Sequence, residues 1–460
     1  MKLYTFLLMA ACIYLLYPIG SFQEQSPSPS SLPTLAWMSN HSQYPFDEYS
    51  PVVENGLVCR STNKGLGLIN IVTGEEIWSE KLRTDMVPAM DCEYLYYVDK
   101  MLWGGYSRLN CYSTQENTLR WTQRIPGRPT FHPVIVDEKM VLTTGAYSEI
   151  VGQEPENENC IICINKFTGK RIWKFEGQGR MNSAPLVIDG IVYASTDDGV
   201  LYAVDLENGN SVWEYETGSP IYISKTPMVY REKIYYVCDS LYCLDLSGEL
   251  LWKKEMNFNQ KIFASKGRLY TLEGDDVVSM DADTGEILWR FHTDNFNFTT
   301  SIVGWEYLFF GSEGMVYCLS RDGELLWEYT IQEHDDFFIH SIPVLSKGYV
   351  VMGTQLGHVH TFRLPGEWCY REAEAMYDDG EYDTARGFYE QALSYYEGIG
   401  NTTLTGIITQ RLTDLGPKPD DCTGWSGIEI QNRIQTFIFV GIGAVLLTGV
   451  LIWRKISRKG

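Results

Sequence analysis

Four of the seven histidines lie in one part of the sequence, where they could together bind a metal. They are His334, His340, His358 and His360. Imidazole is a common ligand of zinc, and residues two apart share one face of a strand, as His358 and His360 would. However, His340 is expected on the innermost strand of the same sheet, about 10 Å away at roughly 4.8 Å per strand step. We therefore predict no metal-binding residues.

The cysteine pattern predicts structural residues rather than redox-active ones. Cys160 and Cys163 have a spacing that occurs in redox and metal sites, but on a strand this odd spacing places the thiols on opposite faces. We interpret Cys163 as a small buried residue, and extend this interpretation to Cys111, Cys243 and Cys318. Two disulfides remain open candidates, Cys238 with Cys243 across a tight turn and Cys369 with Cys422 around a helical region.

The sequence contains no nucleophile elbow, phosphate-binding loop, zinc-protease helix or dinucleotide fingerprint. Residues 281–285, Asp-Ala-Asp-Thr-Gly, resemble part of a calcium loop but coincide with a repeated turn, which is sufficient to explain them. We therefore predict no catalytic residues and no cofactor. The net charge of −22 argues against a nucleic-acid partner.

A unit that recurs seven times must organise the chain. Each copy ends in a tryptophan, at Trp78, Trp121, Trp173, Trp213, Trp252, Trp289 and Trp327. Four residues earlier stands a residue that tolerates the positive φ of a tight turn, namely Gly74, Asn117, Gly169, Gly209, Gly248, Gly285 or Gly323. Nine or ten residues before the tryptophan stands a mostly small residue, Leu68, Cys111, Cys163, Ala203, Cys243, Ser279 or Cys318. The small residue leaves room for the indole, which buries roughly 200 Å².

The spacing of these tryptophans predicts the fold. From Trp37 to Trp368 the intervals are 41, 43, 52, 40, 39, 37, 38 and 41 residues. Four short strands with their connections need roughly 40 residues, so each interval predicts one four-stranded sheet. We predict an all-β, eight-bladed β-propeller, with seven blades as the alternative if the longest interval, with its insertion at 148–159, is irregular.

The two ends of the repeat region indicate how the ring closes. Trp37 has no strands of its own before it, and the last unit loses its pattern because Trp368 follows Gly366 by only two residues. We infer that the strand at Trp37 supplies the missing outer strand of the last blade, which leaves no open end in the ring.

The repeat, with its small residue, polar position, Thr-Gly turn and tryptophan, resembles the quinoprotein-type (PQQ-like) β-propeller family over about residues 33–366. Many members are quinone-dependent dehydrogenases that share an adjacent cysteine pair, a calcium site and often a haem-binding Cys-x-x-Cys-His. This chain has no cysteine pair, and Ile164 follows Cys163 where a haem site has histidine. Because these motifs are absent, we predict a propeller that is not an enzyme.

Residues 367–415 have a helical pattern that resembles one tetratricopeptide helix pair and a further helix. The matching positions are Ala373, Tyr377, Gly380, Tyr382, Ala385, Tyr389 and Ala392. A lone pair cannot bury both of its faces, so it must pack on the propeller, on a partner or on a second copy. A structural adaptor and a peptide-binding groove are both open interpretations.

The ends of the chain predict a membrane protein. We assign residues 1–21 to a signal peptide, 22–33 to a Ser/Pro-rich tether, 34–366 to the propeller, 367–415 to the helical segment and 416–433 to a linker. Residues 434–453 are a 20-residue apolar run that could span a bilayer, and the basic tail 454–460 favours the cytoplasmic side. An uncleaved anchor and a lipid anchor at Cys12 are alternatives. Glycosylation sequons begin at Asn40, Asn297 and Asn401.

The predicted function is that of a membrane-anchored scaffold outside the cytoplasm. In repeat type and location it resembles the propeller lipoproteins of the bacterial outer-membrane assembly machinery, which implies partner proteins. The other partner is the membrane, and no nucleic acid is expected. A quinone-dependent oxidoreductase or a small-ligand-sensing propeller is the alternative.

Overall fold

The computed structural model describes residues 32–416, except 39–51, 55, 63–64, 83, 85–87, 103–105, 130, 146–158, 182, 219–225, 256–261, 294–301, 313, 332–342 and 355–357. The predicted signal peptide, membrane span and cytoplasmic tail lie outside the described residues, as do nearly all of the tether and linker. Within the described ranges, no helix has the length and apolar character needed to cross a membrane.

The first four sheets follow the chain in order. Blade 1 contains β2 (Val52–Glu54), β3 (Leu57–Thr62), β4 (Gly65–Asn70) and β5 (Glu76–Glu80). Blade 2 contains β6 (Ala89–Asp91), β7 (Tyr94–Leu102), β8 (Tyr106–Ser113) and β9 (Thr118–Pro126). Blade 3 contains β10 (Arg128–Pro129), β11 (Val134–Val136), β12 (Lys139–Gly145), β13 (Cys160–Asn165) and β14 (Arg171–Glu176). Blade 4 contains β15 (Leu186–Ile188), β16 (Ile191–Ser195), β17 (Val200–Asp205) and β18 (Ser211–Glu216).

The other four sheets complete the ring. Blade 5 contains β19 (Met228–Tyr230), β20 (Lys233–Val237), β21 (Leu241–Asp245) and β22 (Leu250–Lys254). Blade 6 contains β23 (Phe263–Ser265), β24 (Arg268–Glu273), β25 (Asp276–Asp281) and β26 (Ile287–His292). Blade 7 contains β27 (Tyr307–Ser312), β28 (Met315–Ser320) and β29 (Leu325–Thr330). Blade 8 contains β30 (Val344–Ser346), β31 (Tyr349–Gly353), β32 (Val359–Arg363) and β1 (Thr34–Met38).

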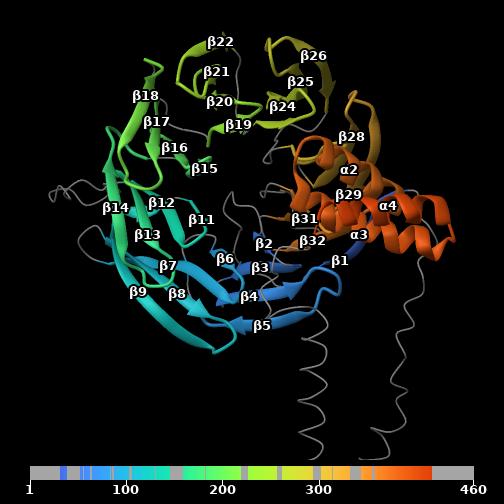
Figure 1. Ribbon diagram of the computed structural model, residues 1–460, viewed down its shortest axis with the longest axis horizontal. Coiled ribbons are helices and arrows are strands. Elements are labelled where there is room, and N and C mark those ends of the chain that lie inside the picture. The colour runs from blue at the N-terminus through green and yellow to red at the C-terminus, as the bar shows by residue number, and fades with distance from the viewer. Residues whose placement is uncertain are drawn as a thin grey trace, which may run out of the picture.

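These eight sheets stand radially around a central axis (Figure 1), so the prediction of eight blades is confirmed and the seven-bladed alternative is wrong. The predicted closure is also confirmed, because β1 pairs antiparallel with β32 and sets Trp37 opposite Thr361. Blade 7 departs from the pattern: among the described residues three strands form its sheet, and an isolated bridge between Val303 and Phe309 stands at its inner edge.

The hydrophobic core is divided among the spaces between blades. Eight clusters of buried residues occur, and each joins side chains of two neighbouring sheets. The two middle strands of a typical blade are buried on both faces, as in β17. Their sequences are therefore nearly continuous apolar runs, and only the outer strands alternate.

Three helices follow the propeller, α2 (Gly366–Asp378), α3 (Tyr382–Gly398) and α4 (Thr402–Asp414). They lie beside blades 7 and 8 (Figure 1) and share one buried cluster with those blades. Of the three open possibilities for this segment, packing on the propeller is therefore the one observed.

Candidate interaction surface

The recurring tryptophans lie on the outer strands, and each contacts the next blade. Six of the seven predicted turn residues are glycines with φ between 68° and 88°, and Asn117 has φ 56°. A Cβ added at Gly74, Gly169, Gly209, Gly248, Gly285 or Gly323 would lie within 3.0 Å of the indole of Trp37, Trp121, Trp173, Trp213, Trp252 or Trp289, in that order. Each indole thus sits where only glycine leaves room, and the Trp37 contact continues the series across the closure.

The indole N–H groups fix the same contacts through hydrogen bonds. Five of them donate to a backbone carbonyl of the next turn, at 2.7–2.9 Å: Trp37 to Ile71, Trp121 to Lys166, Trp173 to Leu206, Trp213 to Leu246 and Trp289 to Arg321. The predicted small residues stand directly opposite the tryptophans on the neighbouring strand, as Ala203 does for Trp213. Most of these indoles are only partly buried, unlike side chains in the hydrophobic core.

Three positions deviate from this arrangement. Trp78 donates to the Asn117 side chain at 3.1 Å instead of to a backbone carbonyl. In blade 6 the equivalent carbonyl accepts the Tyr235 hydroxyl, and among the described residues the Trp252 indole nitrogen has no hydrogen-bond partner. Trp327 has no glycine turn to meet and packs edge-on against Phe362 of blade 8, with ring centroids 5.3 Å apart.

The cysteines are structural where they are described. Cys160 and Cys163 belong to the clusters on opposite sides of blade 3, as predicted. Cys238, Cys243 and Cys369 are buried free thiols, so the two suggested disulfides are not formed. The physical reason in blade 5 is that Cys238 packs against blade 4 and Cys243 against blade 6, on the two faces of one sheet.

The remaining candidate residues are distributed as follows. His360 lies in β32 and His358 directly precedes that strand, whereas His334 and His340 lie outside the described residues. In the part of the chain that the structure describes, no group of three or more His, Cys, Asp or Glu side chains could hold a metal ion. Asn40 and Asn297 also lie outside that part, and Asn401 caps α4 by accepting the Leu404 N–H at 3.2 Å.

The first turn of the helical segment makes an apolar contact with the propeller. Trp368 of α2 stacks on Tyr307 of blade 7, with ring centroids 4.1 Å apart and planes 10° apart. Ala373 and Met376 of the same helix and Phe388 of α3 are fully buried in the shared cluster. One face of α2 and of α3 therefore packs in a cluster with the ring, and α4 packs on α3.

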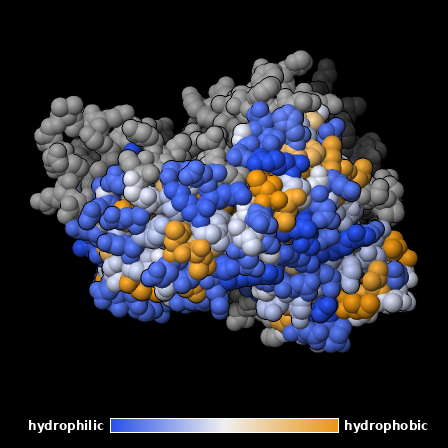
Figure 2. Space-filling model, turned by 90° about the horizontal axis from the view of Figure 1, so that it is seen from above, coloured by the Kyte–Doolittle hydropathy of each residue, from blue (hydrophilic) through white to orange (hydrophobic). Residues whose placement is uncertain are grey.

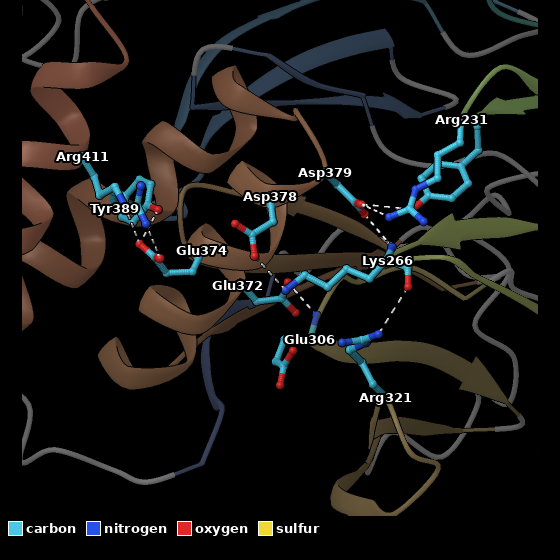
Figure 3. Close-up of polar contacts among 11 residues, drawn as sticks. Arg231, Lys266, Glu306, Arg321, Glu372, Glu374, Asp378, Asp379, Tyr389 and Arg411 are labelled. Carbon is cyan, nitrogen blue, oxygen red and sulfur yellow. Dashed lines mark hydrogen bonds and ion pairs between the residues drawn. The ribbon is translucent and has the colours of Figure 1, made fainter. Parts of the chain in front are cut away.

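Asp378, the last residue of α2, and Asp379, its C-terminal cap, add polar contacts between the helices and the propeller (Figure 3). We call this contact region the joint. The side chain of Asp379, only 4% exposed, accepts the Tyr230 hydroxyl at 3.0 Å and the Lys266 backbone N–H at 2.7 Å. These partners belong to the hairpins of blades 5 and 6. Beside it, the more exposed Asp378 pairs with the Lys266 ammonium at 3.4 Å.

Glu372 makes the corresponding contact with blade 7. Its carboxylate accepts the backbone N–H groups of Trp305, Glu306 and Tyr307 at 3.1, 3.2 and 2.8 Å. The side chain is completely buried. Burial raises the pKa of Glu372 from 4.5 to about 7, although the three hydrogen bonds oppose the shift.

Another acidic residue of α2, Glu374, links the helices to one another. Glu374 accepts the Tyr389 hydroxyl at 2.6 Å and receives both Nε and an Nη of Arg411, at 3.1 and 3.0 Å. These three residues stand on α2, α3 and α4, and Figure 3 shows them converging. These hydrogen bonds therefore link the three helices to one another.

The outer strands carry the most regular exposed apolar side chains. In blades 3–6 the residue directly before the tryptophan is 45–53% exposed: Ile172, Val212, Leu251 and Leu288. We name the outer strands β14, β18, β22 and β26 the outer rim. Each is the last strand of its sheet, so its free edge faces outward. Figure 2 shows apolar patches standing among hydrophilic surface on one side of the molecule.

Sequence reasoning missed the residues that join the helices to the ring. Glu372 and Asp379 carried little signal, because they are two of several acids within and directly after an amphipathic helix. Tyrosines on the second strands were also missed, although Tyr96, Tyr193 and Tyr235 each lie beside the tryptophan of their own blade, with ring centroids 5.9–6.1 Å apart. The recurrence of tyrosine in this strand was the available signal.

Comparison with known proteins agrees with the propeller. A sequence model of the family described as outer membrane protein assembly factor BamB matches residues 47–123, 150–240 and 238–366. The BamB protein of Yersinia pestis is 24% identical over 368 residues, which are 72% of this chain and 88% of that protein. The BamB protein of Burkholderia pseudomallei is 25% identical over 347 residues, 68% of this chain and 84% of that protein.

Solved structures show the same fold at lower identity. BamB from Moraxella catarrhalis is similar with a TM-score of 0.58 and 17% identity, over 72% of this chain and all of that one. A europium-containing methanol dehydrogenase has the same TM-score at 11% identity, over 72% of this chain and 93% of that one. Both likenesses concern the fold alone. The relatives matched by sequence above are named as assembly factors, which agrees with the interpretation that the chain is not an enzyme.

Proposed function

Because the chain belongs to the family described as outer membrane protein assembly factor BamB, we propose that it is a membrane-anchored scaffold that binds other proteins outside the cytoplasm. The family match over most of the propeller carries the scaffold part of this proposal, and the membrane anchoring rests on the sequence. The described part of the molecule adds support, since the interactions reported above are structural: indoles join blades, and carboxylates join helices to blades.

The outer rim is the surface that we propose for partner proteins. Leu251 and Leu288 are 48% and 47% exposed on the neighbouring edge strands β22 and β26. Charged residues flank them: Lys253 pairs with Asp239, and Arg290 pairs with Glu273 and Asp276. Aliphatic side chains surrounded by charges suit a contact that forms and dissociates between soluble domains.

Crosslinking in membranes from the source cells tests the scaffold. We expect a reproducible crosslinked protein with the wild-type chain and its loss in the double variant Leu251→Glu, Leu288→Glu. Val72→Glu is the matched control, because Val72 is 51% exposed but lies in a turn of blade 1. Equal yields from all three chains would contradict the rim. A quinone absorbance with dye reduction after incubation with quinone and calcium would contradict the scaffold itself.

The anchoring is a separate proposal that rests on the sequence. The apolar run 434–453 and the basic tail 454–460 support a single C-terminal span with the propeller outside. Protease added to cells with an opened outer layer should digest the propeller and leave a tag after Gly460 protected. A tag that is cleaved as fast as the propeller would contradict this orientation.

A further inference from the structure

We propose that Glu372 is an ionisable latch that couples the docking of the helical segment on the propeller to pH. Its position carries the inference. The carboxylate stands on α2, its three hydrogen-bond donors stand on blade 7, and water is excluded from the contact. None of the three donors is charged, because all are backbone N–H groups. Ionisation therefore places a charge inside the joint between the two units.

The groups around the latch do not neutralise that charge. From blade 7, the Glu306 carboxylate raises the pKa of Glu372 further. The buried Tyr307 phenol and Cys318 thiol face Glu372 from the same blade, and burial raises the pKa of each. From α2, Cys369 is a buried thiol with its pKa raised to about 12, and Arg371 pairs with the exposed Glu367 at 2.6 Å. Two cations lie nearby: Arg371 is paired with Glu367, and Arg363 of blade 8 acts on Cys369. Among the described residues neither of them forms an ion pair with Glu372.

The sign of the effect follows from proton binding. In the docked form the pKa of Glu372 is about 7, whereas the ordinary value of 4.5 applies once the carboxyl is exposed. Between these values the docked form binds more protons, so docking weakens as the pH rises. The stabilisation is fully present below pH 4.5 and is lost as the pH passes through about 7. The docking equilibrium should change by up to about tenfold per pH unit in this window.

Hydrogen exchange of the full chain tests the latch. We expect exchange at residues 305–307, corrected for its intrinsic pH dependence, to report weaker docking at pH 7.5 than at pH 5. Glu372→Gln stays neutral and should remove this dependence, while Asp379→Asn, at the other contact, should retain it. An unchanged pH dependence in Glu372→Gln would overturn the proposal.

A direct titration covers the case in which Glu372→Gln fails to fold. The side-chain carboxyl signal of Glu372, assigned by carbon-13 labelling of glutamate, should titrate with a midpoint near 7 in the wild-type chain. A midpoint near the ordinary 4.5 would overturn the latch, whatever the variant does. Neither measurement involves a partner protein, so this result and that of the crosslinking experiment are independent.

Discussion

Replacing Gly209 by alanine should destabilise the propeller more than the same replacement at Gly190, although both lie in turns of blade 4. Their φ angles are nearly equal, 75° and 76°. A Cβ at Gly190 meets nothing within 4 Å, so its cost is the positive φ alone, about 1–2 kcal/mol. At Gly209 the Cβ lies 2.7 Å from the Trp173 ring, which adds the cost of overpacking, about 1–3 kcal/mol.

The indole has little freedom to move away from an added Cβ. Its N–H donates to the Leu206 carbonyl at 2.8 Å, and the Trp173 side chain is only 8% exposed. A displaced ring would lose that hydrogen bond, worth about 1 kcal/mol, so the strain is retained in either arrangement.

Equilibrium unfolding in urea, followed by near-ultraviolet circular dichroism, measures both variants against the wild-type chain. We expect Gly209→Ala to lose at least about 1 kcal/mol more stability than Gly190→Ala. Equal losses in the two variants would refute the idea that the indole occupies the space beside the turn glycine.

Three further predictions concern the joint and the blades. Asp379→Ala should cost about 1–3 kcal/mol and increase hydrogen exchange in the hairpins of blades 5 and 6, whereas Asp378→Ala, in an exposed ion pair, should change stability by less than about 1 kcal/mol. Burial raises the pKa of Cys238 and Cys243 to about 11, so both should resist iodoacetamide at pH 8 and react after unfolding, as mass spectrometry would show. Tyr235→Phe should alter stability by less than about 1 kcal/mol in thermal melts, because the neighbouring indole N–H can take over the freed carbonyl.

The propeller could be predicted because its determinants are local and repeated. A turn glycine and its tryptophan are four residues apart, and Trp213 pairs with a residue ten positions earlier, so both relations recur in each copy of the repeat. The closure was also predictable, since it needs only a lone strand at one end and a missing one at the other. Repetition converts a weak local pattern into a definite architecture.

The joint could not be predicted, because its contacts join residues far apart in sequence. Tyr230 and Asp379 are 149 positions apart, and their hydrogen bond depends on how the finished ring presents its hairpins. Glu372 belongs to a helix whose amphipathic pattern does not say that an acid will be buried. The suggested pairing of Cys238 with Cys243 was wrong for a related reason: nearness in sequence does not decide which face of a sheet a side chain occupies.

The position of the helical segment follows from the way the ring closes. Elsewhere a tryptophan rests on the turn that leads into the outer strand of the next blade, but in blade 8 the N-terminal β1 is that strand, so this turn does not exist. Trp327 is consequently left with Phe362 and the surrounding cluster. The chain leaves β32 at Arg363 and begins α2 at Gly366, so the helices arrive at the place that the missing turn would occupy. Closure by the N-terminal strand thus leaves apolar side chains of blades 7 and 8 without a turn to cover them. The helices cover these side chains and share a buried cluster with them.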